Sequence, residues 1–310
     1  MPGPIATVDA PASSANLGSG FDAFAVALSL KLRAELFHGD EPGILLNARG
    51  EGVPADDESP ESNLVIRSFR EGMRLAHGSL GGAGAWRIEV SSMIPAARGL
   101  GSSAAAIVAG LLLGASVGRT APEPDEILRG AARLEGHPDN VAAALYGGFT
   151  LVVGEDGSDL TMRRFRVPEA WIPVLFVSSS LSHTAAMREA LPESVSHRDA
   201  ALQAGRTALL ATAILTSDAG LLAEAMRDRL HQPHRLPLLA GSAELIELAN
   251  DRGAAGACLS GAGPSVLAIC DSPVSAHTVE KAWNSSGVAG MATRLRFDTS
   301  GARVSPPEQD

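Results

Sequence analysis

Two serines follow a Gly-Leu-Gly turn directly ahead of a long apolar, alanine-rich run. An α-helix that begins at these serines presents backbone N–H groups without helical partners, together with the positive end of its dipole. Glycines ahead of it let the backbone approach a ligand closely, and serine hydroxyls add donors and can coordinate Mg²⁺. The segment Ile94–Gly118 therefore predicts either a helix N-terminus that holds an anion or a core helix with a serine cap.

Two further clusters of small and polar residues are candidates for binding a polar ligand. The segment Pro11–Phe24 places Asn16 and Asp22 in a loop between two expected strands, where binding residues are common. The segment Cys258–Ile269 is a Gly/Ser-rich turn between two apolar strands. Each cluster taken alone is also explained as an ordinary turn, so neither by itself indicates a function.

The composition of the whole chain excludes several classes of function. Its 310 residues are 45% hydrophobic and 19% charged, which allows a large core and argues against extended disorder. The net charge of −10 disfavours nucleic acid or an anionic membrane as the main partner. Lys31 and Lys281 are the only lysines, and no GxxxxGKS/T loop is present. Kinases of the P-loop and protein-kinase types are therefore excluded.

We expect a cytoplasmic protein. Cys258 and Cys270 are the only cysteines and form no CxxC motif, which argues against a disulfide framework or a thiolate zinc site. No signal-like segment is seen at the N-terminus, and the longest apolar run, Ala104–Ser116, is too short to span a bilayer.

The elements that must position these clusters alternate between strands and helices. This alternation favours an α+β protein with mixed sheets and a boundary near Arg166–Pro173. Alternating or continuous apolar residues predict strands at 5–8, 24–37, 43–50, 85–94, 149–155, 162–167, 172–179, 257–260, 266–271 and 292–297. Helical spacing predicts helices at 61–76, 124–136, 141–148, 184–191, 198–215, 219–230, 242–253 and 276–286, besides the one that follows Gly101.

In this order and at these separations, the three clusters together resemble the three signature motifs of the GHMP small-molecule kinases. The stretch Pro95–Ala104 matches the ATP loop of that family. Four further segments resemble its homoserine kinase branch: Asn63–Val65, Leu134–Leu151, Thr184–Ala201 and Asp228–Arg235. The resemblance covers almost the whole chain.

The resemblance implies a two-domain GHMP kinase fold. Its N-terminal ATP-binding domain, residues 1–168, is expected to be ribosomal protein S5 domain 2-like, and its C-terminal domain, residues 169–310, ferredoxin-like. It also implies that ATP and Mg²⁺ serve to phosphorylate the side-chain hydroxyl of L-homoserine, a step of threonine biosynthesis. The family allows a homodimer, and no nucleic-acid or membrane partner is expected.

The resemblance also assigns the nucleotide and metal sites. Asn63 is expected near the adenine, and a loop serine, Ser103 or Ser102, is expected to hold Mg²⁺ together with Glu135. Glu126 is the alternative glutamate. The residues expected to wrap the ATP phosphates are Pro95, Ala96, Ala97, Arg98, Gly99, Leu100, Gly101, Ser102, Ser103 and Ala104.

The amino-acid substrate is expected to bind beside the nucleotide. By resemblance, Asn16, Asp22 and His137 lie near its ammonium and hydroxyl groups. Arg188 and Arg235 face its carboxylate, which suits the bidentate fork of a guanidinium. The candidate catalytic residues are Asn140, Asp139 and Arg188, with Asn140 positioning the hydroxyl and Asp139 as an alternative base. A strong base is not required, because phosphoryl transfer depends mainly on alignment and charge neutralisation.

Two positions depart from the family pattern, and they leave alternatives open. Ala25 stands where glycine is usual, and Gln203 stands where asparagine is usual. A GHMP kinase for another hydroxy amino acid, such as L-threonine, is one alternative. A non-catalytic GHMP-fold sensor is a second, although Ser102, Ser103 and Glu135 argue against it. A decarboxylase of the same fold would need a site richer in cations.

Overall fold

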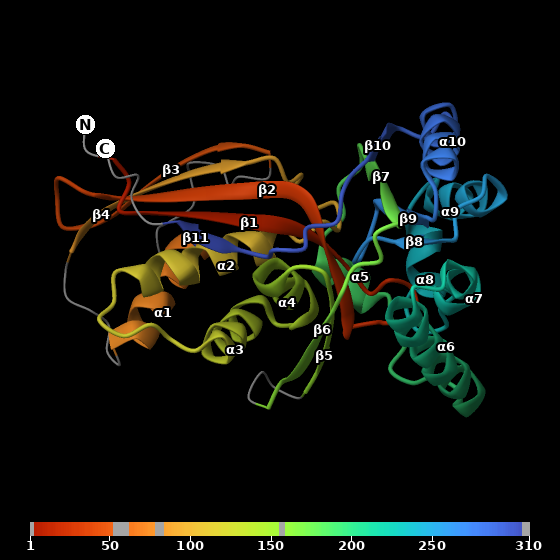
Figure 1. Cartoon of the computed structure of the whole chain (residues 1–310), viewed down its shortest axis with the longest axis horizontal. Helices are drawn as coiled ribbons and strands as arrows, with labels where there is room; N and C mark the ends of the chain where they lie inside the picture. Colours follow the sequence, from red (N-terminus) through yellow and green to blue (C-terminus); the bar gives the residue numbers. More distant parts are fainter. Residues whose placement is uncertain (1–2, 52–61, 78–83, 155–158, 306–310) are drawn as a thin grey trace.

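The strands of the chain form two separate sheets. The computed structural model describes residues 3–51, 62–77, 84–154 and 159–305, and within them the larger sheet has seven strands and the smaller one four. The two sheets follow one another along the long axis of the molecule (Figure 1). Both carry helices, which confirms the predicted α+β fold in two parts.

The larger sheet carries the first motif segment. Its order is β11-β1-β2-β4-β3, with β5 paired to β2 and β6 paired to β5. β3 and β4 are parallel, and the other neighbours are antiparallel. The strands are β1 (Ala6–Ala15), β2 (Phe24–His38), β3 (Gly43–Gly50), β4 (Ala85–Ser92), β5 (Phe149–Val153), β6 (Thr161–Phe165) and β11 (Arg303–Ser305).

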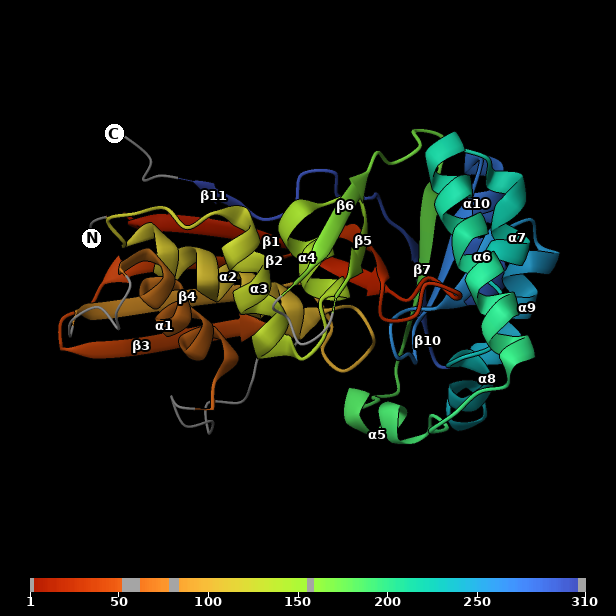
Figure 2. The same cartoon turned by 90° about the horizontal axis from the view of Figure 1, so that it is seen from below.

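One face of this sheet is covered by α1 (Leu64–His77), α2 (Ser102–Ser116), α3 (Pro124–Glu135) and α4 (Asp139–Tyr146) (Figures 1 and 2). α2 is buried between the sheet and α1, so its apolar residues surround the whole helix instead of forming one stripe. Glycines bring the two helices together, because a Cβ at Gly114 would lie 2.0 Å from the carbonyl oxygen of Phe69. This close packing holds α2 against α1, and the Gly/Ser motif lies at the other end of the same helix.

The smaller sheet has the order β10-β7-β9-β8, and all its neighbours are antiparallel. β9 separates the parallel strands β7 and β8, which is the split βαβ arrangement of a ferredoxin-like domain. Its strands are β7 (Ile172–Ser178), β8 (Gly256–Leu259), β9 (Val266–Cys270) and β10 (Gly290–Arg294). Its helices are α5 (Thr184–Glu189), α6 (His197–Thr216), α7 (Leu222–Ala225), α8 (Gln232–Arg235), α9 (Ser242–Asp251) and α10 (Pro273–Asn284), with short 3₁₀ turns at Ala219–Leu221 and Leu236–Leu238.

An apolar cluster joins the two parts. Leu17, Phe24 and Phe149 from the first part pack with Leu210 of α6 and Leu267 of β9. All five side chains are almost completely buried. The contact therefore holds the loop after β1 against the second part of the chain.

The structure differs from the sequence-based expectations in four places, one of which is the short helix α8, which was not predicted. β1 continues to Ala15, so the first part of the first motif segment, Pro11–Ala15, is strand and its loop is shorter than predicted. The helix predicted at 219–230 ends at Ala225, because the carboxylate of Asp228 accepts backbone N–H groups of the next residues and turns the chain. β11, which was not predicted, returns from the smaller sheet to pair with β1. The division at 168/169 stays a prediction, although the chain passes from one sheet to the other between β6 and β7.

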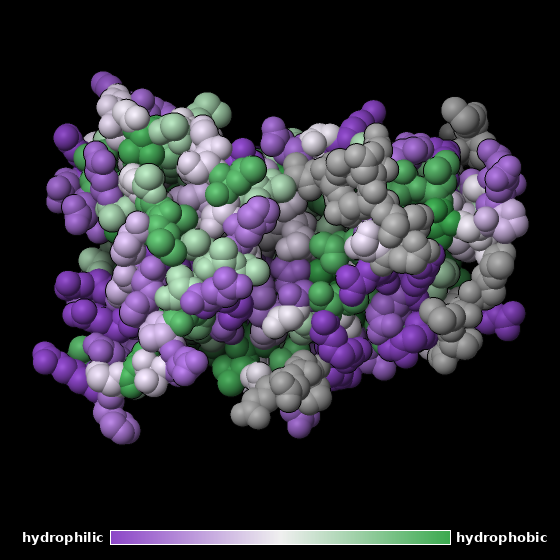
Figure 3. Space-filling view, turned by 180° about the vertical axis from the view of Figure 1, so that it is seen from behind, coloured by the Kyte–Doolittle hydropathy of each residue, from purple (hydrophilic) through white to green (hydrophobic). Residues whose placement is uncertain are grey.

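The surface is mixed in character. Figure 3 shows hydrophilic side chains interspersed with small hydrophobic patches over the back of the molecule. The large exposed hydrophobic residues are spread over different elements, among them Leu45 of β3, Leu215 of α6 and Val274 of α10. Among the helices of the described ranges, none combines the length and the apolarity that crossing a bilayer requires.

Candidate active site

The three motif segments meet at one cavity between the two parts of the chain. The cavity has a volume of about 300 Å³. The N–H of Gly261 donates to the carbonyl of Ala15 at 3.1 Å, and Ser260 Oγ donates to the carbonyl of Gly99 at 2.7 Å. These bonds connect the third segment to both of the others. The three segments lie far apart in the sequence, and the fold brings them together at this cavity.

The start of α2 forms one wall of this cavity. Gly99 and Gly101 have left-handed φ angles of 74° and 64°. A Cβ at Gly99 would lie 2.0 Å from the carbonyl oxygen of Ser260, and one at Gly101 would lie 2.2 Å from Ser13 Oγ. No side chain caps α2 and its first turn has no acidic residue, so the alternative of a serine cap is wrong. The uncapped helix start, with Ser102 on the cavity wall, can receive an anion.

Not every residue of the predicted ATP loop reaches the cavity. The cavity wall includes Ala96, Ala97, Gly99, Leu100, Gly101, Ser102 and Ser103 but not Pro95, Arg98 or Ala104. The guanidinium of Arg98 donates to the carbonyls of Ser178 at 2.8 Å and Ala96 at 3.1 Å. Arg98 therefore ties the loop to the end of β7, and its side chain lies outside the cavity wall.

Ser103 and Glu135 form a pair of oxygen ligands at the start of α2. Ser103 Oγ donates to Glu135 Oε1 at 2.6 Å. Burial raises the pKa of Glu135, and the hydrogen bond from Ser103 opposes this rise. Two hard oxygens beside an anion site fit Mg²⁺, which takes few protein ligands and completes its shell with phosphate and water. The described residues contain no group of three or more His, Cys, Asp or Glu side chains that could hold a metal on their own.

The alternative glutamate has a different role. Glu126 Oε2 accepts the backbone N–H of Glu123 at 3.0 Å, in the capping box at the start of α3. Glu135 is the last residue of the same helix, so the two carboxylates lie at opposite ends of α3. Glu126 therefore stabilises a helix start and does not reach Ser103.

A short chain of polar contacts runs from Glu135 into the start of α4. His137 Nε2 lies 3.8 Å from Glu135 Oε1, and His137 Nδ1 lies 2.7 Å from Asp139 Oδ1. Burial acts to lower the pKa of His137, but the hydrogen bond and charge of Asp139, with the charge of Glu135, raise it above its ordinary value. Asp139 also accepts the backbone N–H of Asn140 at 2.7 Å. Asp139 is thus buried and engaged, which suits orienting His137.

Asn140 leaves one end of its amide for a ligand. Its Oδ1 accepts a hydrogen bond from Ser13 Oγ at 2.8 Å. No described residue accepts from its Nδ2, and Asn140 lies on the cavity wall. With this orientation of the amide, the Nδ2 group can donate to a hydroxyl oxygen.

The loop after β1 brings Asn16 and Asp22 to the cavity. Both residues have left-handed φ angles, 70° and 53°, which Asn and Asp tolerate better than most residues. Asn16 Oδ1 accepts the N–H of Asp22 at 3.0 Å, and Asn16 Nδ2 donates to the carbonyl of Gly261 at 2.8 Å. Arg188 binds the Asp22 carboxylate bidentately at 2.8 and 3.0 Å. The fork that was expected to face a substrate carboxylate is thus occupied by Asp22 in this structure.

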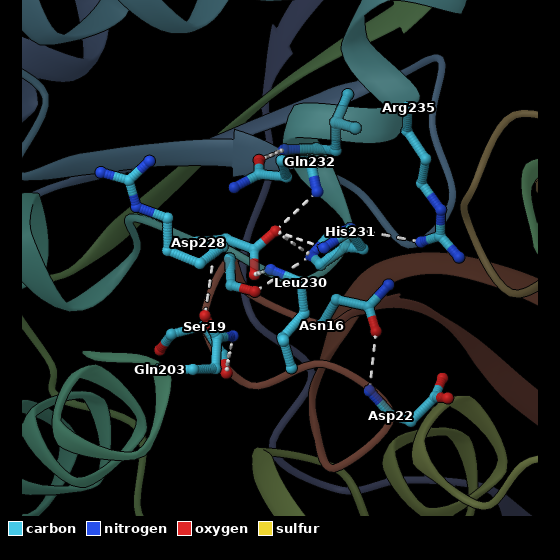
Figure 4. A network of polar contacts seen from close by, with 12 residues as sticks. Asn16, Ser19, Asp22, Gln203, Asp228, Leu230, His231, Gln232 and Arg235 are labelled. Atoms are coloured by element: carbon cyan, nitrogen blue, oxygen red, sulfur yellow. Dashed lines mark hydrogen bonds and ion pairs between the residues drawn. The ribbon is translucent and has the colours of Figure 1, made fainter. Parts of the chain in front are cut away.

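Arg235 is the second expected arginine, and its surroundings differ. It is 2% exposed and has no carboxylate within 4 Å among the described residues. Its Nε donates to the carbonyl of Met187 at 3.2 Å and its Nη1 to His231 Nδ1 at 3.2 Å (Figure 4). Burial, and then the charge of Arg188, lowers the pKa of Arg235. A buried cation on the cavity wall without a carboxylate partner is suited to an anionic group of a ligand.

Ala25 and Gln203, the two residues that depart from the family pattern, are both accommodated by their surroundings. The methyl group of Ala25 packs in a small cluster with Ala15, Ala27 and Ala143. Gln203 Nε2 donates to the carbonyl of Ser19 at 2.8 Å, and its Oε1 accepts the N–H of Arg229 at 2.9 Å. Figure 4 shows Gln203 between the loop after β1 and the segment that leads to Arg235.

Sequence reasoning missed some residues at this site. Ser182 is buried on the cavity wall, its N–H donates to the carbonyl of Ala97 at 2.9 Å, and its Oγ has no partner among the described residues. Phe21 stacks on His231 and lies beneath the guanidinium of Arg235, with 5.3 Å between the charge and the ring centroid. No local sequence pattern marks Ser182 as a site residue, whereas Phe21 lies inside the first motif segment.

The chain matches two family descriptions and a series of known proteins. "GHMP kinases N terminal domain" matches residues 63–148, and "GHMP kinases C terminal" matches residues 210–289. The chain is 41% identical to the homoserine kinase of Streptomyces coelicolor over 305 residues, which cover 96% of this chain and 94% of that protein. It is also 41% identical to the homoserine kinase of Thermus thermophilus over 265 residues, with 84% and 85% covered.

Solved structures show the same similarity. The crystal structure of homoserine kinase from Cytophaga hutchinsonii matches with a TM-score of 0.86 at 28% identity and covers 97% of this chain and 98% of that one. The structure of mevalonate kinase from L. major, in complex with R-mevalonate, matches with a TM-score of 0.69 at 15% identity over the full length of both chains. The second likeness shows the fold alone.

Proposed function

The chain belongs to the GHMP kinase family, and on that premise we propose that it transfers the γ-phosphoryl group of ATP to the side-chain hydroxyl of L-homoserine. The product is O-phospho-L-homoserine, an intermediate of threonine biosynthesis. One observation carries the proposal: an uncapped helix start and a buried, carboxylate-free arginine line the same cavity. Such a cavity can take a polyphosphate at one wall and an amino-acid carboxylate at another. The identity of 41% with known homoserine kinases over nearly the whole chain supports the choice of amino acid.

The nucleotide is assigned to the wall formed by the start of α2. The backbone from Gly99 to Ser103 would receive the phosphates. Asn63 would lie near the adenine, because its Oδ1 caps α1 by accepting the N–H groups of Val65 and Ile66 while its Nδ2 remains for a ligand. Ser103 and Glu135 would hold Mg²⁺, which neutralises charge on the phosphate oxygens when it is bound.

The amino acid is assigned to the opposite wall. Arg235 would receive its carboxylate, and Asp22, with Asn16 beside it, would accept from its ammonium. Asn140 Nδ2 would donate to the hydroxyl oxygen and leave its lone pair directed toward the phosphate. His137, oriented by Asp139, would lie beside this hydroxyl. These residues act by alignment and charge, which a loose phosphoryl-transfer transition state requires.

A coupled ADP-release assay tests the proposal. ATP and Mg²⁺ are combined with homoserine, threonine, serine or mevalonate in separate reactions. We expect homoserine to give the highest kcat/KM of the four. A higher kcat/KM for threonine or serine would reassign the substrate within the hydroxy amino acids. Turnover of mevalonate alone, or of none of the four, would overturn the proposed function.

A further inference from the structure

His231 lies fully buried between the loop after β1 and Arg235. Its Nε2 is 3.0 Å from the carbonyl oxygen of Gly18, and its Nδ1 is 3.2 Å from Nη1 of Arg235. The ring stacks on Phe21, with centroids 5.1 Å apart. Figure 4 shows the ring between Asp228 and Arg235. His231 therefore touches Arg235 of the proposed substrate wall and also the loop that carries Asn16 and Asp22.

The contacts of the two ring nitrogens define one tautomer. Besides the carbonyl oxygen of Gly18, Nε2 has the carboxylate of Asp228 beside it, with Oδ2 at 3.4 Å, and an ionised carboxylate also only accepts. A carbonyl oxygen only accepts, so Nε2 carries the proton, and a guanidinium only donates, so Nδ1 keeps its lone pair. Burial lowers the pKa of His231 to about 4, against the opposing charge of Asp228, and Arg235 lowers it further. Asp22 is the other charged group that faces the ring, and it favours the imidazolium. The ring consequently stays neutral around pH 7.

The same contacts fix the plane of the guanidinium. Met187 holds Nε from one side and His231 holds Nη1 from the other. The Nη2 group has no partner among the described residues. Because a guanidinium is planar, two anchored nitrogens determine where its remaining donors point.

We propose that His231 is a positioning residue for substrate binding: its Nδ1 lone pair holds the guanidinium of Arg235 in the orientation that receives the substrate carboxylate. The inference rests on the proposed function, because it names how that carboxylate is received. A purely structural role for His231 would depend instead on the contacts of Nε2 with Gly18 and Asp228.

Two substitutions separate the two contacts. In His231→Asn the side-chain oxygen lies near the former Nδ1 and can still accept from Arg235, while the bond to Gly18 is lost. In His231→Gln the amide reaches the former Nε2 and can still donate to Gly18, while the acceptor for Arg235 is lost. We expect His231→Gln to raise the KM for homoserine about tenfold, the equivalent of one lost hydrogen bond, and His231→Asn to change it about threefold or less.

Further measurements make the comparison specific. The KM for ATP should stay within about twofold in both variants, since the nucleotide lies on the other wall. In an Arg235→Ala background His231→Gln should have no further effect on the KM for homoserine, because the group that it positions is absent. Equal effects of Asn and Gln, or additive effects with Arg235→Ala, would overturn the proposal.

The wild-type protein gives a readout that does not depend on the variants folding. Imidazole ¹⁵N chemical shifts should report the neutral tautomer with the proton on Nε2 at neutral pH. A proton on Nδ1, or an imidazolium, would overturn the proposal. The kinetic comparison uses whichever amino acid the wild type phosphorylates best, so an error in the choice of homoserine leaves the role of His231 testable. If the wild type phosphorylates no amino acid, both the proposed function and the role of His231 fail.

Discussion

Arg235 and Arg188 were expected to share one task, but their surroundings predict different effects of removing them. Arg235 keeps donors for a ligand in a buried position, whereas Arg188 already binds Asp22. Losing one charge-assisted hydrogen bond costs about 1.5–3 kcal/mol. Arg235→Ala should therefore raise the KM for homoserine roughly 10- to 100-fold.

The corresponding loss for Arg188 should be smaller. The Asp22–Arg188 pair is partly exposed, with 37% and 39% of the two side chains accessible. Pairs of this kind are worth less than about 1 kcal/mol, which is a factor of about five. Removing Arg188 also frees Asp22 for the substrate ammonium, which offsets part of the loss. We expect Arg188→Ala to raise the KM for homoserine about fivefold or less.

The assay is coupled ADP release with each substrate varied in turn. The KM for ATP should hardly move in either variant, and Arg235→Lys should recover only part of the loss, because a point charge cannot form the fork. Homoserine amide, which lacks the carboxylate, should be a poor wild-type substrate that loses little more in Arg235→Ala. Melting temperatures show whether each variant is folded. Equal losses for acid and amide, or a larger effect of Arg188→Ala than of Arg235→Ala, would refute the reasoning.

Four further predictions concern the rest of the site. Replacing both Ser102 and Ser103 by alanine should abolish ATP turnover with little loss of stability, since alanine favours helix and neither serine caps α2; near-normal turnover would rule out the phosphate wall. Glu135→Gln should lower kcat and raise the Mg²⁺ requirement at least about tenfold, because an amide is a poorer ligand than a carboxylate. An unchanged Mg²⁺ dependence would contradict the assignment of Glu135 as a metal ligand. Burial raises the pKa of Glu135, so ionising its carboxyl group lowers the stability of the fold as the pH rises above the ordinary pKa. The metal-free Gln variant should therefore melt no lower than the wild type near pH 7. The pKa of His137 is raised in the folded protein, so protonated His137 stabilises the fold fully below its ordinary pKa, and this contribution is lost as the pH rises through the folded-state pKa. His137→Gln should therefore lower the melting temperature more at about pH 6 than at about pH 9. Equal losses at the two pH values would exclude the pairing with Asp139. Gln203→Asn, one methylene shorter, cannot reach both Ser19 and Arg229 and should raise the KM for homoserine about two- to fivefold with the KM for ATP unchanged; a wild-type KM for homoserine would show that the bridge is dispensable.

Local patterns in the sequence were enough to locate most of the elements and the three motif segments. β2, β3 and β4 were predicted almost to the residue, because alternation of apolar residues reports a strand with one buried face. The Gly/Ser start of α2 was found although the helix is buried on all sides, since glycine and serine mark a helix start independently of periodicity. The family resemblance then indicated which residues gather at the site.

The tertiary structure decided how these residues are partnered. Arg188 and Asp22 are 166 residues apart, and their pairing follows from the packing of α5 against the loop after β1. Both side chains carry the same charges whether they bind each other or a ligand, so no local pattern could show the pairing. The neutral tautomer of His231 is likewise set by one carbonyl and one guanidinium from different segments. The sequence by itself determined which chemical groups are present and which elements carry them. Only the fold decided which groups are already satisfied and which, like Arg235, remain open to a ligand, because hydrogen-bond donors and acceptors are paired through space and not along the chain.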